Sequence, residues 1–364
     1  MKRVIISGGG TGGHIFPALA IAEALKSEHP AVDILFVGAH GKMEMEKVPQ
    51  AGYAIKGLYI SGFNRKQLFK NLFLPFKVLR SLYAARAILK SFNPELVIGV
   101  GGYASGPTLQ VANWLKIPTL IQEQNSFPGK TNLILAKKAK AICVAYPQME
   151  RFFPKKLIHL TGNPVRKDLI LGTPNKHDGY SFYGLDPALK TVFIMGGSLG
   201  AKSINDSVVK ELAHLVNADI QILWQCGKGN YEQLKELALS TNIKLLAFIE
   251  RMDYAYAVAD IIVSRAGATS ISELTLVGKP CILVPSPNVT EDHQTKNAMA
   301  LSSVNAAILV SDSKVLDALW PTIYSTLNDL NSISTLSQNI KSLALPHATD
   351  HIISICNQLL THES

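Results

Sequence analysis

The sequence has no long apolar segment and few cysteines. No run among its 364 residues approaches the ~18 consecutive apolar residues that a membrane-spanning helix needs. The apolar residues near the amino terminus, Val4 to Ile6, lead directly into glycines and fall far short of the ~7 to 15 apolar residues of a signal peptide. We therefore predict neither export nor a membrane span. The four cysteines are too far apart for a CxxC pair and are expected to be reduced, mostly buried thiols: Cys143, Cys226, Cys281 and Cys356.

Two common metal-binding patterns are also missing. The sequence contains no Asp-x-Asp pair and no His-Glu-x-x-His motif, the usual devices for holding Mg²⁺, Mn²⁺ or Zn²⁺. We therefore expect no metal and no cofactor. Negative charge that develops at a site would have to be stabilised by backbone N–H groups, a helix dipole and an arginine.

Acidic residues are absent from Lys47 to Pro94, a stretch that contains nine basic residues. Because the formal net charge is +9, the rest of the chain is electrically neutral. Apolar residues here recur mostly at three- and four-residue intervals, which predicts amphipathic helices, and Pro75 is expected to separate two of them. The basic residues are Lys47, Lys56, Arg65, Lys66, Lys70, Lys77, Arg80, Arg86 and Lys90, and the apolar ones are Leu68, Phe69, Leu72, Phe73, Phe76, Leu79 and Tyr83.

This basic and partly apolar stretch is typical of a surface that docks on anionic lipid head groups. Two other interpretations stay open. Nucleic acid is a rival partner for a basic face, but no recognised nucleic-acid motif accompanies it, so we expect none to bind. Alternatively, the apolar residues could simply pack into a domain core beneath a solvated basic face.

Short apolar runs alternate with longer helix-patterned segments, in two series. Strands buried on both faces and joined by helices indicate parallel α/β sheets, and 364 residues are enough for two domains at roughly 100 to 200 residues each. We place the boundary near Gly162 to Pro164, and expect a last helix at about 348–361 that returns to the first domain. The expected strands are 4–7, 34–37, 96–100, 119–122 and 142–144 in the first series and 192–195, 220–224, 261–263 and 282–284 in the second.

A glycine-rich turn follows the first expected strand of each series, at 8–13 and again 188 residues later at 196–201. Small residues there let the backbone approach a phosphate at a helix amino terminus. For the first turn, a dehydrogenase would also need an acidic residue near the end of the second strand, where Val37 to His40 stand instead. A tight turn without a ligand is the other alternative.

The second glycine-rich turn is close to a Walker A loop, because Lys202 and Ser203 follow it. However, Ala201 replaces the second glycine, and the strand that ends at Val263 is followed by Ser264 rather than by an acidic residue that could hold Mg²⁺. A nucleotide hydrolase is therefore disfavoured.

Three further features follow expected strands. His14 comes directly after the first turn, in a helix whose first turn is expected to contain Pro17, and its imidazole could accept a proton or merely bind phosphate or cap the turn. A third small-residue loop, 101–107, could bind a second phosphate or be a simple turn. In the segment 264–273, Glu273 could bind a ribose diol, or it could form a capping box with Ser270.

Taken in order, these motifs resemble the bacterial MurG transferases over almost the whole chain. The matching motifs are Gly-Gly-Thr-Gly-Gly-His at 9–14, Gly-Gly-Tyr-x-Ser-Gly-Pro at 101–107, Glu-Gln-Asn at 123–125, Gly-Asn-Pro-Val-Arg at 162–166, Gly-Gly-Ser-x-Gly-Ala at 196–201, Arg-x-Gly-Ala-x-x-x-x-Glu at 265–273 and Asp-His-Gln-x-x-Asn-Ala at 292–298. Together they are far more specific than any single loop.

The resemblance implies a GT-B-type fold, α/β in class, with two Rossmann-like domains whose parallel sheets face a cleft. Residues 1–163 and 346–364 would form the acceptor and membrane-facing domain, and residues 164–345 the donor domain. The implied reaction moves N-acetylglucosamine from UDP to the C4 hydroxyl of undecaprenyl-pyrophosphoryl-muramoyl-pentapeptide, with inversion. Its product is the lipid-linked disaccharide of peptidoglycan, needed for cell shape and division. The implied location is peripheral, on the cytoplasmic face of the inner membrane, with cell-wall synthesis proteins as possible partners.

The resemblance also assigns residues. For the catalytic base, His14 is the first candidate and Glu123 the second. The donor contacts, matched position by position, are Thr11, Gly12, Gly13, Asn125, Arg166, Ser198, Ile249, Ala268, Thr269, Ser270, Ile271, Ser272, Glu273 and Gln294. The acceptor pyrophosphate is assigned to Gly10, Thr11, Gly102, Tyr103 and Ser105.

Two positions depart from the family pattern, and two other functions remain as alternatives. Gln122 stands where relatives often carry His, and Leu199 replaces a frequent Gln, so fine contacts near the donor are expected to differ from the family pattern. A UDP-sugar epimerase would use a similar nucleotide pocket but would not need the basic apolar surface. A sugar-nucleotide-binding module without catalysis would tolerate loss of His14 and Glu123, and both are present.

Overall fold

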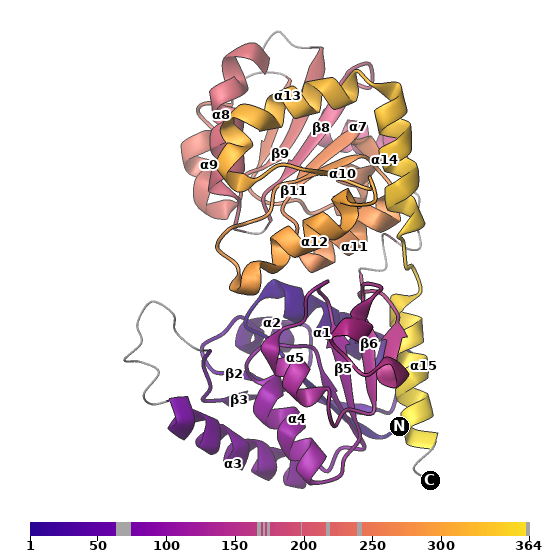
Figure 1. Ribbon diagram of the computed structural model, residues 1–364. Coiled ribbons are helices and arrows are strands. Elements are labelled where there is room, and N and C mark those ends of the chain that lie inside the picture. Colours follow the sequence, from indigo (N-terminus) through magenta and orange to yellow (C-terminus); the bar gives the residue numbers. More distant parts are fainter. Residues whose placement is uncertain are drawn as a thin grey trace. The chain divides into compact units, whose positions relative to one another are not determined.

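The chain folds into two compact units, each an α/β domain. The computed structural model describes residues 1–62, 74–165, 169, 172, 175–197, 199–215, 219–238 and 242–361. One unit comprises Met1–Val165 and His347–Ser364, and the other comprises Arg166–Pro346 (Figure 1). The chain therefore returns to its first unit at the carboxyl end.

The first unit is built on a seven-stranded parallel sheet in the order β3-β2-β1-β4-β5-β6-β7. Its strands are β1 (Arg3–Ser7), β2 (Asp33–Ala39), β3 (Ala54–Leu58), β4 (Leu96–Gly99), β5 (Thr119–Glu123), β6 (Ala141–Val144) and β7 (Ile158–Leu160). The expected parallel sheet is confirmed. Both edge strands, β3 and β7, were not expected from the sequence.

Helices cover both faces of this sheet because its central strands are apolar on both sides (Figure 1). Val4 and Ile6 of β1 pack into the core beneath one group of helices, and Ile5 packs into the core beneath the other. The first group is α1 (Gly12–Glu28), α2 (Glu44–Gln50) and α15 (Ala348–Thr361). The second group is α3 (Leu74–Phe92), α4 (Ser105–Trp114) and α5 (Lys130–Leu135).

Two prolines lie elsewhere in their helices than the sequence suggested. Because α1 begins at Gly12, Pro17 is the sixth helical residue and lies in the second turn, not the first. Its missing N–H removes the bond that would otherwise reach the carbonyl of Gly13. Pro75 is the second residue of α3, a position that tolerates proline. The helix expected before Pro75 lies outside the described residues.

The second unit contains a six-stranded parallel sheet in the order β10-β9-β8-β11-β12-β13. Its strands are β8 (Lys190–Met195), β9 (Ile220–Gln225), β10 (Ile243–Leu246), β11 (Ile261–Ser264), β12 (Cys281–Leu283) and β13 (Ile308–Leu309). Its helices are α7 (Lys176–Tyr183), α8 (Lys202–Leu215), α9 (Lys228–Leu234), α10 (Met252–Val258), α11 (Ala268–Val277), α12 (His293–Ser302), α13 (Val315–Leu327) and α14 (Leu330–Ser342). One core lies between the sheet and α8, α9 and α13.

The strand order of each sheet determines where its loops meet. In the first unit the order reverses between β1 and β4, and in the second between β8 and β11. Ligands of open α/β sheets bind beyond the carboxyl ends of the strands at such a switch point. The glycine-rich loops 8–13 and 100–104 follow β1 and β4, and the segments 196–201 and 265–267 follow β8 and β11. The motifs of each unit thus converge at its switch point.

Candidate active site

The two glycine-rich loops of the first unit pack backbone against backbone. The N–H of Gly9 donates to the carbonyl of Gly101 at 3.3 Å. A Cβ on Gly102 would lie 2.3 Å from the carbonyl oxygen of Gly9, and one on Gly8 would lie 2.8 Å from that of Gly101. Gly101 and Gly102 also have φ angles of 88° and 87°. These glycines are therefore required by close approach and by conformation.

His14 lies at the junction of these loops, as the third residue of α1. Its Nδ1 is 3.0 Å from the carbonyl oxygen of Gly9 and 3.3 Å from Oγ1 of Thr11. Because a carbonyl oxygen can only accept, Nδ1 carries a proton, and in the neutral ring Nε2 has the lone pair. A Cβ on Gly101 would lie 2.9 Å from both Cδ2 and Nε2, so this edge of the ring faces the third loop. The half-buried imidazole thus has the tautomer that a general base requires.

A buried carboxylate that the sequence did not suggest lies beneath the first loop. Glu44 is 1 % exposed, and its two oxygens accept hydrogen bonds from the N–H of Gly10 at 2.8 Å and of Ala39 at 3.0 Å. Gly10 is one of the residues assigned to the acceptor pyrophosphate, but its N–H is engaged by Glu44 inside the protein. Glu44 lies five residues beyond the end of β2, and its carboxylate is buried against the backbone instead of facing a ligand.

The third loop presents one side chain to solvent and buries another. Tyr103 is 42 % exposed, and its ring leaves no room for a Cβ on Gly62, which would come within 1.9 Å of it. The buried hydroxyl of Ser105 donates to the carbonyl of Gly102 at 2.8 Å. Of these two residues, Tyr103 can reach a ligand, whereas Ser105 shapes the loop.

Glu123, the second candidate base, is only 2 % exposed. One carboxylate oxygen accepts from the backbone and side-chain nitrogens of Asn125, at 3.0 and 3.2 Å. The other accepts from the N–H of Gly129 at 3.2 Å and from Nδ2 of Asn132 at 2.8 Å. Burial raises the pKa of this carboxyl, and the four hydrogen bonds oppose the rise. With four donors, Glu123 holds the segment 123–132 together.

Gln122, one of the departures from the family pattern, belongs to a buried network of amides. Its Nε2 donates to Oδ1 of Asn163 at 2.8 Å, and Nδ2 of Asn163 donates to the carbonyl of Gln124 at 3.0 Å. Nε2 of Gln124 donates to the carbonyl of Val100 at 2.9 Å and also to Oε1 of Gln122. The network thus joins the Glu-Gln-Asn and Gly-Asn-Pro motifs to the third loop.

In the second unit, Gln225 positions the second glycine-rich loop. Its Oε1 accepts from the N–H of Gly196 at 3.1 Å, and its Nε2 donates to the carbonyl of Gly197 at 2.9 Å. A Cβ on Gly200 would lie 2.0 Å from the carbonyl oxygen of Cys226. Leu199, the other departure, is 83 % exposed. Ser198 lies outside the described residues, as does Arg166.

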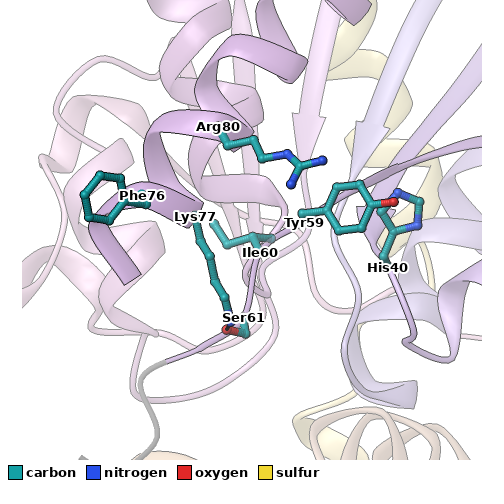
Figure 2. Close-up of a pocket in the computed structure, with 7 residues that line it drawn as sticks. All are labelled: His40, Tyr59, Ile60, Ser61, Phe76, Lys77 and Arg80. Atoms are coloured by element: carbon teal, nitrogen blue, oxygen red, sulfur yellow. Dashed lines mark hydrogen bonds between the residues drawn. The ribbon is translucent and has the colours of Figure 1, made fainter. Parts of the chain in front are cut away.

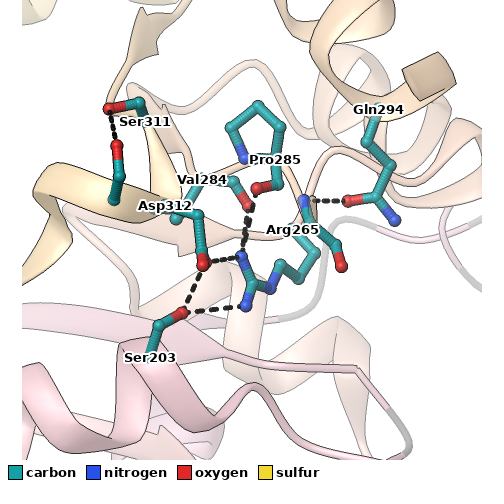
Figure 3. A network of polar contacts seen from close by, with 9 residues as sticks. Ser203, Arg265, Val284, Pro285, Gln294, Ser311 and Asp312 are labelled. Carbon is teal, nitrogen blue, oxygen red and sulfur yellow. Dashed lines mark hydrogen bonds and ion pairs between the residues drawn. The ribbon is translucent and has the colours of Figure 1, made fainter. Parts of the chain in front are cut away.

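Ser203 of the Walker-like segment and Arg265 are engaged within the unit (Figure 3). Lys202 pairs with Asp206 at 2.6 Å, and the hydroxyl of Ser203 donates to Oδ1 of Asp312 at 2.5 Å. Nη2 of Arg265 donates to Ser203 at 2.9 Å, and Nη1 contacts Asp312 and two backbone carbonyls. Because Ser203, Arg265 and Asp312 bind one another, these three residues support the loops rather than a nucleoside triphosphate.

The capping-box interpretation of Ser270 and Glu273 is wrong. Helix α11 begins at Ala268, and its N-cap residue is Gly267, which makes no side-chain cap hydrogen bond. Ser270 is therefore inside the helix and cannot be its cap. The first-turn N–H groups have no partner within the helix, and together with the helix dipole they favour an anion.

Glu273 lies on α11 beyond this first turn and is 5 % exposed. It accepts a hydrogen bond at 2.9 Å from the hydroxyl of Tyr256 on α10. Of the other predicted donor contacts, Ile249 and Ile271 are buried, and Oε1 of Gln294 accepts from the N–H of Ser286 at 2.9 Å. The structure brings 268–273 to the switch point of the second unit, close in sequence to β11.

The described part of the chain contains no group of three or more His, Cys, Asp or Glu residues that could hold a metal ion. Its helices include none that is both long enough and apolar enough to span a bilayer.

Comparison with known proteins agrees with this arrangement. Residues 4–144 match the glycosyltransferase family 28 N-terminal domain, and residues 191–352 match the C-terminal domain of that family. A UDP-N-acetylglucosamine–N-acetylmuramyl-(pentapeptide) pyrophosphoryl-undecaprenol N-acetylglucosamine transferase of Cytophaga hutchinsonii is 55% identical over 97% of this chain and 95% of its own. The enzyme of the same description from Flavobacterium psychrophilum is 53% identical over 96% of both chains.

Solved structures give the same family. The crystal structure of Acinetobacter baumannii MurG has a TM-score of 0.80 and 31% identity, and covers 98% of this chain and 100% of its own. A UDP-GlcNAc 2-epimerase from Neisseria meningitidis, with a TM-score of 0.65 and 13% identity, shares the fold alone. The two units and their loops thus define a glycosyltransferase of family 28 with the GT-B fold. Within that class, the chain belongs to the MurG family.

Proposed function

We propose that the chain transfers N-acetylglucosamine from UDP to the C4 hydroxyl of undecaprenyl-pyrophosphoryl-muramoyl-pentapeptide, with inversion at the anomeric carbon. The observation that carries this proposal is the match along nearly the full length of both chains to relatives described by this reaction. The product is the lipid-linked disaccharide used in peptidoglycan synthesis.

The reaction is a direct displacement. Nε2 of His14 accepts the proton of the acceptor hydroxyl while the oxygen forms a bond to the anomeric carbon of N-acetylglucosamine. The bond from that carbon to the diphosphate oxygen breaks, and UDP departs with the electron pair. The hydrogen bond from Nδ1 to the carbonyl of Gly9 fixes the ring and stabilises the imidazolium that forms. Glu123, whose oxygens are engaged by four donors, positions Asn125 instead of acting as the base.

The acceptor pyrophosphate is assigned to the two loops of the first unit. Thr11 and Tyr103 are exposed there, and Gly102 lets the two loops pack closely, because a Cβ on it would clash with the backbone of Gly9. Gly10 and Ser105 support these loops from within, through Glu44 and through the carbonyl of Gly102.

The donor is assigned in part to the switch point of the second unit, in addition to the contacts expected from Thr11, Gly12, Gly13 and Asn125 of the first. The first-turn N–H groups of α11 take the diphosphate, and Glu273 takes the ribose diol. Negative charge on the departing UDP is then stabilised without a metal ion.

We also propose that α3 docks the protein on the anionic cytoplasmic face of the inner membrane, where the lipid-linked acceptor would lie. Residues 75–80, the start of this helix, are all exposed. Phe76, Leu79 and Tyr83 are 71 %, 63 % and 79 % exposed, so these three do not pack into the core. Lys77 and Arg80 stand among them and can bind lipid phosphates.

A cavity of about 470 Å³ beside this helix suits a phosphate head group (Figure 2). The guanidinium of Arg80 lies 4.4 Å from the centre of the Tyr59 ring, and Nζ of Lys77 donates to Oγ of Ser61 at 3.2 Å. Both cations therefore line a hollow next to Phe76. An anionic head group could bind in the hollow while the exposed apolar side chains enter the lipid.

The test of the reaction is transfer in the presence of EDTA. Purified protein is incubated with labelled UDP-N-acetylglucosamine, with and without the lipid-linked muramoyl-pentapeptide. We expect label in the lipid only when the acceptor is present, and undiminished transfer in EDTA. Conversion of the UDP-sugar to its C2 epimer without acceptor would support the epimerase alternative instead. A strict requirement for a divalent cation would contradict the proposed mechanism.

A further inference from the structure

We propose that Tyr256 is a positioning residue that orients Glu273 for the ribose of the donor. This inference rests on the proposed function and goes beyond it, because Tyr256 belongs to none of the motifs described above. The hydroxyl of Tyr256 donates to Oε2 of Glu273 at 2.9 Å.

The ring of Tyr256 is itself held firmly. The residue is 2 % exposed, and its ring meets that of Phe193 on β8 edge to face, at 5.8 Å between centres and 75° between planes. Its hydroxyl also lies 3.8 Å from the sulfur of Met195 at the end of the same strand. The central strand of the sheet thus fixes the direction of the phenol.

Glu273 needs such a partner because of where it lies. The carboxylate is buried and is beyond the first turn of α11, where helix N–H groups are no longer free. A hydrogen bond from a phenol to a carboxylate is charge-assisted and fixes one oxygen in space. A carboxylate has about four acceptor positions, so it has the capacity to bind ribose hydroxyls as well as this phenol. A preoriented carboxylate loses less rotational freedom when the donor binds.

The direct test uses Tyr256→Phe, which removes one oxygen and keeps the ring. Binding of UDP and of 2′-deoxy-UDP is measured by calorimetry for the intact wild type and the variant, together with the thermal midpoint of unfolding. The matched control is Tyr183→Phe, since Tyr183 is also buried in this unit and its hydroxyl donates to the carbonyl of Arg251 at 2.7 Å, not to Glu273.

We expect the wild type to bind UDP more tightly than 2′-deoxy-UDP. Tyr256→Phe should weaken UDP binding about five-fold, the usual effect of one lost hydrogen bond, and change 2′-deoxy-UDP binding much less. The preference for the ribonucleotide therefore shrinks, whereas Tyr183→Phe keeps it. The inference is overturned if Tyr256→Phe retains the wild-type preference, or if both variants lose it equally along with stability. A wild type that binds no UDP would overturn the proposed function itself.

Discussion

At the scale of single residues, His14 and Gly101 constrain each other. Gly101 has a φ of 88°, and the point where its Cβ would stand is 2.9 Å from the ring of His14. Nearby, Oε1 of Gln124 is buried without a hydrogen-bond partner among the described residues. The Cδ2–Nε2 edge of the His14 ring can occupy this position only because Gly101 has no side chain.

Gly101→Ala should therefore reduce activity more than its effect on stability explains. The left-handed conformation costs an alanine about 1 to 2 kcal/mol of folding free energy. The added methyl also displaces the imidazole, and a displacement of about 1 Å at a catalytic group can lower kcat about 10²-fold. Urea unfolding and steady-state kinetics measure the two effects separately.

Gly41→Ala is the matched control. Gly41 has a φ of 69°, but a Cβ there would meet nothing within 4 Å. This variant should lose a similar free energy of unfolding and keep its kcat. Equal kcat for the two variants would show that Gly101 does not control the position of His14.

Some candidate residues of the site could be predicted from the sequence, and others could not. His14 and Glu273 could be proposed from the sequence because each directly follows or belongs to a motif after a strand. Glu44 and Tyr256 were missed because each acts on a residue 34 or 17 positions away, through contacts that only the folded chain creates. Neither carries a local pattern that distinguishes it from a core or surface residue.

At the scale of elements, the strands that the sequence did not predict are the four edge strands, β3, β7, β10 and β13. The central strands were predicted because they are buried on both faces and read as continuous apolar runs. An edge strand pairs on one side only, and β3 reads Ala-Ile-Lys-Gly-Leu with exposed positions along it. Hydrophobic runs therefore identify the middle of such a sheet and not its edges.

Helix α3 provides the prediction at this scale. Changing Lys77, Arg80 and Arg86 to Gln should lower the affinity for vesicles that contain anionic lipid about 100-fold, because each charge near the surface contributes about 1 kcal/mol of binding free energy. The affinity is measured by cosedimentation. High salt should weaken binding of the wild type as well, because the attraction is screened.

The control for this experiment removes the same charge from the second unit. Lys210, Lys235 and Lys244, all exposed, are changed to Gln, and vesicle binding should remain close to that of the wild type. If both triple variants bind equally at low salt, or if no protein binds, α3 is not the docking surface.

At the scale of the whole molecule, the two units share one arrangement of sheet and loops. In each unit a parallel sheet reverses its strand order, and loops from the two strands at the reversal carry the candidate residues. The glycine-rich turns of the two series predicted this repetition. The return of α15 to the first unit, where it packs against α1, follows from the apolar spacing of the last segment. The partners that each loop residue has inside its own unit could not be predicted, because they depend on how the loops close.

We therefore expect the two units to have different roles: His14 in the first activates the acceptor hydroxyl, and Glu273 in the second binds the donor. The most direct test measures both the dissociation constant for UDP-N-acetylglucosamine and kcat for His14→Ala and Glu273→Ala. We expect His14→Ala to keep wild-type donor affinity and to lose about 10² to 10⁴ in kcat. Glu273→Ala should weaken donor binding about ten-fold or more. Loss of donor affinity in His14→Ala without a fall in kcat, or unchanged donor affinity in Glu273→Ala, would contradict this division.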